Sequence, residues 1–155
     1  MILCYSATQK TKPYAEVLGT ILEKPVYMLE ADFSILKSLW LTLRKKPAPV
    51  HNMPATSDIT DDDIYLCGPV WGGYPAAPLR YFLMNASLSG KKVHMLLTAG
   101  MSHNKYGDNA KKLIIEAGAV PGNVEVFSVD TKADTKMNQE IIEEHIRHLM
   151  LQDKV

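Results

Sequence analysis

Hydroxyl side chains gather where a short apolar run, Met1–Tyr5, gives way to a polar loop. The loop reads Ser6-Ala7-Thr8-Gln9-Lys10-Thr11 and supplies three hydroxyl groups. A periodic segment from Tyr14 to Leu22 follows, so the pattern predicts a buried strand, a tight loop and a helix. The unpaired N–H groups and the positive dipole end at such a helix start suit a dianionic phosphate. An ordinary Ser/Thr helix cap is the alternative, and the loop by itself favours neither.

A tryptophan followed by two glycines marks a second stretch that could contact a ligand. Ile64–Trp71 is a continuously apolar run, which is typical of a parallel strand buried on both faces. The segment after it, Gly72–Pro78, is rich in glycine and proline and is expected to be a loop. A third stretch, Ala99–Asp108, is a polar loop that follows another apolar run.

Composition limits the classes of function. The 155 residues predict one domain, and 17 basic residues balance 17 acidic ones, so no net field attracts nucleic acid or an anionic membrane. Cys4 and Cys67 lie inside apolar runs, where reduced and buried thiols are expected, and no zinc pattern or disulfide framework is present. Because no apolar stretch approaches 18 residues and no basic leader precedes the first strand, we expect a cytoplasmic protein without a membrane span.

Strand and helix patterns alternate five times along the chain. The expected strands are Met1–Tyr5, Pro25–Glu30, Ile64–Trp71, Lys91–Thr98 and Val124–Val129. The expected helices are Tyr14–Leu22, Phe33–Lys46, Leu79–Leu83, Asn109–Ala117 and Met137–Leu151. In the last helix we expect Ile141, Ile142, His145 and Leu149 to point inward. This alternation predicts an open parallel sheet with helices on both faces and right-handed crossovers.

In such sheets, ligands bind outside the carboxyl ends of the strands. The segments expected to meet at that edge are Ser6–Thr11, Trp71–Tyr74, Thr98–Tyr106 and Asp130–Lys136. Asp61-Asp62-Asp63 precedes a strand and therefore belongs at the opposite edge, where a solvated acidic turn is favoured over a metal site or a docking cluster.

Three of these loops, in their order and spacing, resemble the flavodoxin family, and the resemblance extends from Met1 to about Leu151. Ser6–Thr11 is similar to the family's phosphate loop, usually S/T-x-T-G-x-T. The most specific match is Gly68-Pro69-Val70-Trp71-Gly72-Gly73-Tyr74-Pro75-Ala76-Ala77-Pro78-Leu79-Arg80-Tyr81-Phe82-Leu83. It looks like the strand-three signature of short flavodoxin-like proteins, in which an aromatic residue and a glycine border the flavin ring. Thr98-Ala99-Gly100 is similar to the family's last flavin loop.

The resemblance implies one FMN-binding domain over residues 1–155, with a three-layer flavodoxin-like α/β fold and a five-stranded parallel sheet in the order 2-1-3-4-5. By matched position, the FMN phosphate would be held by hydroxyl and N–H groups of Ser6, Ala7, Thr8, Gln9, Lys10 and Thr11. The ring would be bordered by Pro69, Val70, Trp71, Gly72 and Gly73, with Trp71 against one face and Gly72 near flavin N5. Backbone donors to the pyrimidine edge would come from Thr98, Ala99 and Gly100, and Tyr106 is a candidate for the second ring face.

The sequence departs from the family pattern at two places. Gln9 stands where the phosphate loop usually has glycine, so this loop must reach its conformation without glycine, or the pocket is altered. The third loop contains Met101-Ser102-His103-Asn104-Lys105 instead of the usual aromatic residue.

For several side chains, the sequence allows two interpretations. Lys10 could add charge at the phosphate, although a solvent-facing position is favoured. For Trp71, a flavin contact is favoured over core packing, because a tryptophan before two glycines at a strand end has little room inside. His103 could donate a proton near the flavin, but a solvent-exposed loop position is favoured.

Three hypotheses for function follow. The first is a flavodoxin-like protein that binds FMN non-covalently and mediates electron transfer, with the flavin supplying the chemistry. The second is an FMN-dependent NAD(P)H reductase of quinones or similar small acceptors, which a neutral, partly basic rim mildly favours. The third is a cofactor-free interaction module, which Gln9 and the unusual third loop favour. The expected partner is a redox protein or a small-molecule electron acceptor, and a homodimer is a possible assembly.

Overall fold

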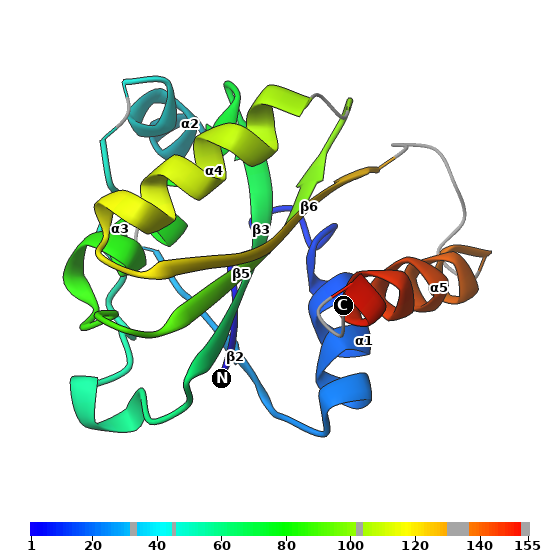
Figure 1. The fold of residues 1–155 in the computed structure, drawn as a ribbon. Coiled ribbons are helices and arrows are strands. Elements are labelled where there is room, and N and C mark those ends of the chain that lie inside the picture. Colours follow the sequence, from blue (N-terminus) through cyan, green and yellow to red (C-terminus); the bar gives the residue numbers. More distant parts are fainter. Residues whose placement is uncertain (32–33, 45, 102–103, 130–136, 153–155) are drawn as a thin grey trace.

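The computed structural model describes residues 1–155 except 32–33, 45, 102–103, 130–136 and 153–155. A twisted parallel sheet runs through the centre, with helices on both of its faces (Figure 1). Its strands are β1 (Ile2–Cys4), β2 (Val26–Met28), β3 (Asp63–Trp71), β5 (Lys92–Ala99) and β6 (Val120–Ser128).

The strand order confirms the expected topology. The strands lie in the order β2-β1-β3-β5-β6, and each neighbouring pair along this path is parallel. A two-residue strand, β4 (Tyr74–Pro75), pairs antiparallel with the end of β3 and lies off this path. When β4 is left out of the numbering, this is the order 2-1-3-4-5 that the resemblance implies.

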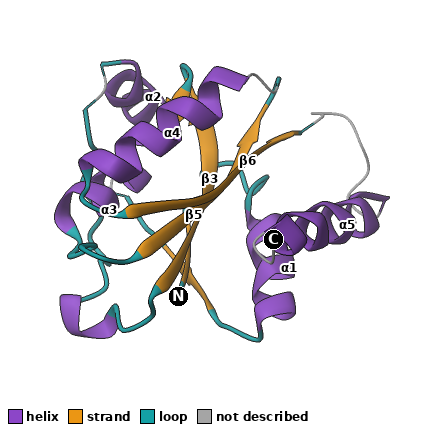
Figure 2. Cartoon of the chain, viewed as in Figure 1, coloured by secondary structure: helices purple, strands orange, loops and turns teal. Residues whose placement is uncertain are grey.

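The helices form the two outer layers (Figure 2). They are α1 (Lys12–Leu22), α2 (Ile35–Leu43), α3 (Ala77–Asn85), α4 (Asn104–Glu116) and α5 (Met137–Gln152), and a 3-10 turn η1 covers Thr56–Asp58. Helices α2, α3 and α4 lie on one side of the sheet, and α1 and α5 lie on the other. The predicted three-layer arrangement is therefore confirmed.

Each face of the sheet has its own apolar core, and this explains the continuous apolar runs in the sequence. Leu3 of β1 joins the core under α3 and α4, together with Phe82 and Ile114. The neighbouring Ile2 points to the other face and packs with Leu18 of α1. Because successive strand residues face opposite sides and both sides are covered, most positions along these strands are apolar.

Some element boundaries and one inward-facing position differ from the sequence prediction. Helix α4 begins at Asn104 rather than Asn109, and β6 begins at Val120 rather than Val124. In α5, Ile142 is buried as expected, but Ile141 is 47% exposed and the expectation of an inward position is wrong. The missed inward residue is Ile146, one turn after Ile142, which packs in the core shared with α1. Phe33 and the side chain of Leu149 lie outside what the structure describes.

The two thiols are buried neighbours across β1 and β3, where Cys4 pairs with Cys67 in register. Burial raises the pKa of Cys4 to about 12 and also raises the pKa of Cys67. We expect neither thiol to react with Ellman's reagent at pH 8 in the folded protein, and both to react in urea. A rapid reaction of the folded protein would contradict this burial.

The same shifts predict alkaline destabilisation. An unfolded cysteine titrates near about pH 8.5, below the folded pKa of both thiols. Stability is therefore complete below that pH and is lost progressively as the pH rises toward the folded pKa values. Urea unfolding measured at pH 7 and pH 10 checks the sign, and an unchanged midpoint would contradict it.

Candidate functional site

The loop between β1 and α1 is closed by its own polar groups. The Thr11 N–H donates to Ser6 Oγ at 3.1 Å, and Gln9 Nε2 donates to the Ser6 carbonyl at 3.3 Å. Gln9 has a φ of 59°, in the left-handed region that glycine occupies without strain. Glutamine therefore adopts, in this loop, a backbone conformation that glycine would reach without strain.

The side chains of this loop divide into two groups. Ser6 and Thr11 are buried, whereas Thr8, Gln9 and Lys10 are exposed and Ala7 is intermediate. Helix α1 starts directly after the loop. In its first turn, Pro13 has no N–H group and the Tyr14 N–H donates to the Thr11 carbonyl at 3.1 Å. The positive end of the helix dipole therefore favours an anion here, and donors to it would come mainly from the loop before the helix.

A buried pair of hydroxyls joins this loop to the end of β5. Thr11 Oγ1 lies 2.8 Å from Thr98 Oγ1, and both side chains are almost fully buried. After Thr98, the Ala99 carbonyl accepts from the Val129 N–H at 2.8 Å and fixes the strand end. The structure thus brings the first and third loops together, as the sequence predicts, through a contact that the sequence did not specify.

Replacing Thr98 with valine should destabilise the protein, because the shape is kept while the partner of the Thr11 hydroxyl is lost. Leaving a buried hydroxyl unsatisfied costs about 1–3 kcal/mol. The free energy of unfolding in urea measures this cost. The double variant Thr11→Val with Thr98→Val removes both polar groups and should recover part of the loss. Equal stability of T98V and the parent protein would contradict the buried pair.

The end of β3 turns sharply into β4 through two glycines. Gly72 and Gly73 have φ values of 57° and 85°, and Trp71 pairs with Tyr74 across the turn. Positive φ at both central residues is the pattern of a type I′ hairpin, which needs glycine or a small polar residue. The sequence analysis missed β4, although a two-residue Gly-Gly connection is a recognised hairpin signal.

Trp71 is half-buried at this strand end. Its ring meets the Tyr5 ring edge-on, with centroids 6.0 Å apart and an interplanar angle of 85°. It also packs against the core on the α3 side of the sheet. One part of the indole thus contributes to packing, and the remainder is exposed at the carboxyl end of β3.

Residues of α2 and α4 lie close to the Gly72–Gly73 hairpin on two sides. Asn109 Nδ2 donates to the Gly73 carbonyl at 2.9 Å, and a Cβ placed on Gly73 would lie 3.6 Å from the Tyr106 ring. A Cβ on Gly72 would lie only 2.5 Å from Leu43 Cδ2. The structure therefore places Tyr106 beside the hairpin, and it adds Asn109 and Leu43, which sequence reasoning missed. The expected contact of Tyr106 with the second ring face stays a prediction.

Part of the predicted edge lies outside the described residues. This holds for Ser102, for His103 and for the loop Asp130–Lys136. The candidate site is consequently built from Ser6–Thr11, the Trp71–Gly73 hairpin, Thr98–Gly100 and Tyr106.

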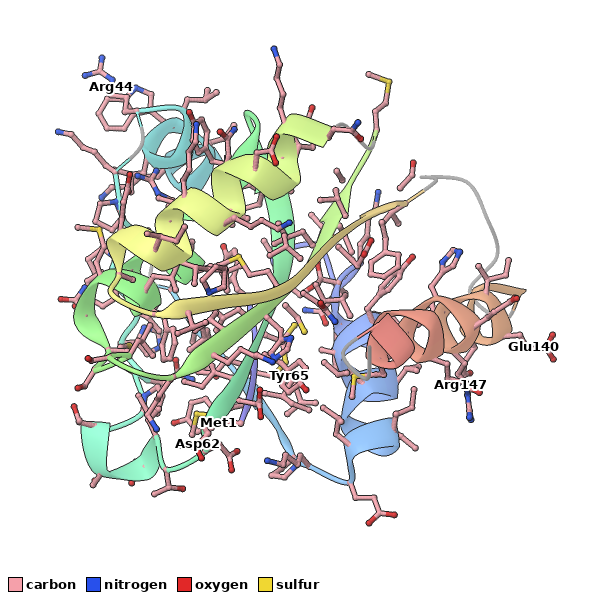
Figure 3. The ribbon with its side chains drawn as sticks, in the orientation of Figure 1. Met1, Arg44, Asp62, Tyr65, Glu140 and Arg147 are labelled. Atoms are coloured by element: carbon pink, nitrogen blue, oxygen red, sulfur yellow. The ribbon has the colours of Figure 1, made fainter. Side chains whose placement is uncertain are left out.

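The acidic run lies at the opposite edge of the sheet, as predicted. In Figure 3, Met1 and Asp62 lie at the lower edge, far from Arg44 beside the end of α2. Asp61 binds the N-terminal ammonium and lies 3.0 Å from Lys24 Nζ, and hydrogen bonds from these two groups lower the pKa of its carboxyl group. Asp63 Oδ1 lies 3.1 Å from Nε2 of the buried His94. Asp62 and Asp63 are exposed, which agrees with the expected solvated turn, and two of the three carboxylates also have protein partners.

Within the described part of the chain, no helix has the length and apolar character to cross a membrane. Within the same residues, no group of three or more His, Cys, Asp or Glu side chains is placed to hold a metal ion.

Comparison with known proteins shows that the fold of this chain is similar to those of several solved structures. No protein-family model matches the sequence, and no curated protein matches it. A candidate flavoprotein from Bacteroides uniformis is 17% identical, with 95% of this chain and 96% of that chain covered and a TM-score of 0.71. A flavoprotein in complex with FMN from Lactobacillus acidophilus is 23% identical over 81% of this chain and 90% of that chain, with a TM-score of 0.59.

A third solved structure is the two-electron reduced flavodoxin from Megasphaera elsdenii. It is 16% identical, with 92% of this chain and 96% of that chain covered and a TM-score of 0.57. At these identities the similarity establishes the fold, which is flavodoxin-like.

Proposed function

We propose that this chain binds FMN non-covalently at the carboxyl edge of its sheet and mediates electron transfer. The observation that supports this most is the conformation of the Ser6–Thr11 loop, where Gln9 has a φ of 59° at the start of α1. This backbone places N–H groups at a helix N-terminus, as binding of a terminal phosphate requires. The FMN complex from Lactobacillus acidophilus, with a similar fold, agrees with this proposal.

The residues present fit the chemical groups of FMN. The exposed Thr8 and the N–H groups from Ala7 to Lys10 would bind the phosphate, since the Thr11 N–H already donates to Ser6 Oγ. The exposed Lys10 side chain is close by in the chain. The buried Ser6 and Thr11 hydroxyls would stabilise that loop. The Ser6 hydroxyl accepts from the Thr11 N–H, and the Thr11 hydroxyl is hydrogen-bonded to Thr98.

The ring system would lie between the hairpin and the end of β5. Trp71 and Tyr106 would exclude water from it, with Pro69, Val70, Gly72 and Gly73 along one edge. Backbone groups of Thr98, Ala99 and Gly100 would orient its polar edge. Bound FMN would supply reversible uptake and release of electrons, which no side chain of this site provides.

The identity of the electron acceptor is a separate part of the proposal. Our first candidate for the acceptor is a redox partner protein. Our second candidate is a small molecule, in which case the chain would be an FMN-dependent NAD(P)H reductase of quinones or similar small acceptors. The exposed Lys10 and Lys105 near the site favour the second candidate, because they would attract an anionic dinucleotide and repel a basic redox protein. A cytoplasmic location and a homodimer stay predictions.

Titration of the purified apo-protein with FMN, followed by flavin fluorescence, tests the proposal. We expect micromolar or tighter binding with strong quenching, and relief of that quenching in Trp71→Ala. The chain has two tryptophans, so Trp40→Ala, on the exposed side of α2, is the matched control and should quench like the parent protein. Absence of binding at high micromolar FMN would overturn the proposal in favour of a cofactor-free module. Steady-state NAD(P)H oxidation with a quinone then separates reductase from carrier.

A further inference from the structure

Helix α2 presents three large apolar side chains at the surface of the protein. Leu36, Trp40 and Leu43 are 79%, 49% and 60% exposed. Six of the nine residues of this helix are apolar, and its inner side packs against α3 and the β3–β4 hairpin. A helix that is apolar beyond the face packed on its own protein is usually covered by a second surface.

The spacing of these three residues is that of two helices that pack side by side. They follow one another at steps of four and then three residues, which is the d-a-d pattern of a heptad repeat. Side chains at a and d positions insert between those of a second helix. We call Leu36, Trp40 and Leu43 the α2 seam. Its pattern predicts a partner that is itself a helix with an apolar face.

The charges beside the α2 seam are positive. Residues 35–46 include four Lys or Arg and no Asp or Glu. Lys37 and Arg44 are exposed and directly follow the two leucines, at the e positions, and the exposed Lys46 comes shortly after the helix. Arg44 lies at the outer end of α2 (Figure 3), with its guanidinium carbon 4.4 Å from the centre of the Trp40 ring. Charges that flank such a seam select the partner, so these cations favour a helix flanked by Asp or Glu.

Two other occupants fit the α2 seam less well. A second copy of α2 would bring the same cations to one interface, where like charges repel. An anionic membrane binds a helix through a broad apolar face together with a positive field. The α2 seam is a single narrow row, and the chain as a whole has no net charge.

One end of the α2 seam adjoins the candidate FMN site. Leu43 of the seam lies against the hairpin, since a Cβ on Gly72 would be 2.5 Å from Leu43 Cδ2. A helix docked on the seam would therefore end beside Gly72, along which we place one edge of the flavin ring.

We propose that the α2 seam is the docking surface for an acidic amphipathic helix of a partner protein. The apolar face of that helix would pack on Trp40 and the two leucines, and its carboxylates would pair with Arg44 and Lys46. The identification of this partner as a redox protein rests on the proposed function, because it depends on a flavin beside Gly72.

Two matched synthetic peptides test the proposal. Both have about three heptads with leucine at a and d, and one has glutamate at e and g where the other has lysine. Each is titrated into the full chain, with and without saturating FMN, and amide chemical shifts are followed. We expect the glutamate peptide to shift α2 signals in both states and to bind at least about tenfold more tightly than the lysine peptide. Added salt should weaken its binding.

Variants with matched controls make the test specific to this surface. Trp40→Ala should weaken binding of the glutamate peptide at least about tenfold, because a central aromatic residue carries much of the energy of an interface. Ile141→Ala, at a 47% exposed position of α5 on the other side of the sheet, should change nothing. Arg44→Glu should reverse the preference between the peptides. Arg147→Glu, at an exposed position of α5, is its charge control (Figure 3). If Trp40→Ala does not fold, Leu36→Ala provides the same test.

Four outcomes would overturn the proposal. These are no shift of α2 signals with the glutamate peptide, equal affinity for the two peptides, α2 signals that change with the concentration of the chain alone, and α2 signals that respond to phosphatidylglycerol vesicles but not to the glutamate peptide. The third outcome would identify a second copy as the occupant, and the fourth would identify a membrane. If the glutamate peptide shifts α2 but FMN does not bind, the docking surface is supported and only the redox role of the partner is refuted.

Discussion

Replacing Gln9 with proline is expected to weaken FMN binding at least about tenfold while the sheet stays folded. Proline holds φ near about −65°, which is incompatible with the φ of 59° at Gln9. Forcing such a position costs about 1–3 kcal/mol, so the loop will rearrange and lose the phosphate geometry. Proline also removes one N–H donor from the loop. The measurement is the dissociation constant for FMN, with far-ultraviolet circular dichroism as the check on folding.

The matched control is Gln9→Gly, which keeps the left-handed conformation without strain. We expect this variant to bind FMN as tightly as the parent protein or more tightly. It also removes the hydrogen bond from Gln9 Nε2 to the Ser6 carbonyl. Loss of binding in Q9G would therefore show that this side-chain contact, rather than the backbone conformation, shapes the loop. Unchanged binding in Q9P would remove the main support for the proposed phosphate site.

Replacing Gly122 with alanine is the substitution that we expect to destabilise the fold most, by about 1–3 kcal/mol or more. A Cβ at this position would lie 2.7 Å from Cε1 and Nδ1 of His94. That ring cannot move aside, because Nδ1 accepts from the Asn123 N–H at 3.1 Å and Nε2 lies 3.1 Å from Asp63 Oδ1. It is also stacked on Tyr65, with centroids 4.5 Å apart.

Urea unfolding of G122A measures this effect, and a second glycine provides the control. Gly107 lies inside α4, where a Cβ would approach its nearest neighbour, Val124, at 3.9 Å. Gly107→Ala should be neutral or stabilising by up to about 1 kcal/mol, because alanine favours the helix. In a His94→Ala background, Gly122→Ala should cost much less than in the parent protein. Equal costs in both backgrounds would show that the His94 ring is not the obstacle.

The long apolar strands and their alternation with helices were predictable from the sequence, and so was the edge where the site lies. Gln9 illustrates the limit of such reasoning, since residue type alone did not reveal that a glutamine would adopt a positive φ. Asn109 is a second example. Its amide reaches Gly73 only because α4 packs beside the hairpin, and that packing depends on residues distant in sequence.

The misplaced boundaries have a common physical cause. The start of α4 contains Gly107 and polar residues of low helix propensity, but burial of Ala110 and Ile114 on this helix outweighs local preference. The start of β6 contains Pro121 and Gly122, which normally interrupt strands. They are tolerated because β6 is at the edge of the sheet and its register with β5 shifts between Val93 and Met95.

The interior position of β1, between β2 and β3, has a consequence for how the chain folds during synthesis. Strand β1 pairs with β2 on one side and with β3 on the other, where Ile2 lies opposite Tyr65. A ribosome therefore releases β1, α1 and β2 long before the second partner of β1 is available. Until β3 emerges, one edge of β1 stays unpaired, and the face with Leu3 stays uncovered because it packs with residues of α3 and α4. Unpaired strand edges favour pairing with other chains. Pairing β1 with β3 closes the long stretch of chain between them. We expect this pairing to be a slow step of folding, because the conformational entropy of that stretch is lost before the contacts between the two strands stabilise it.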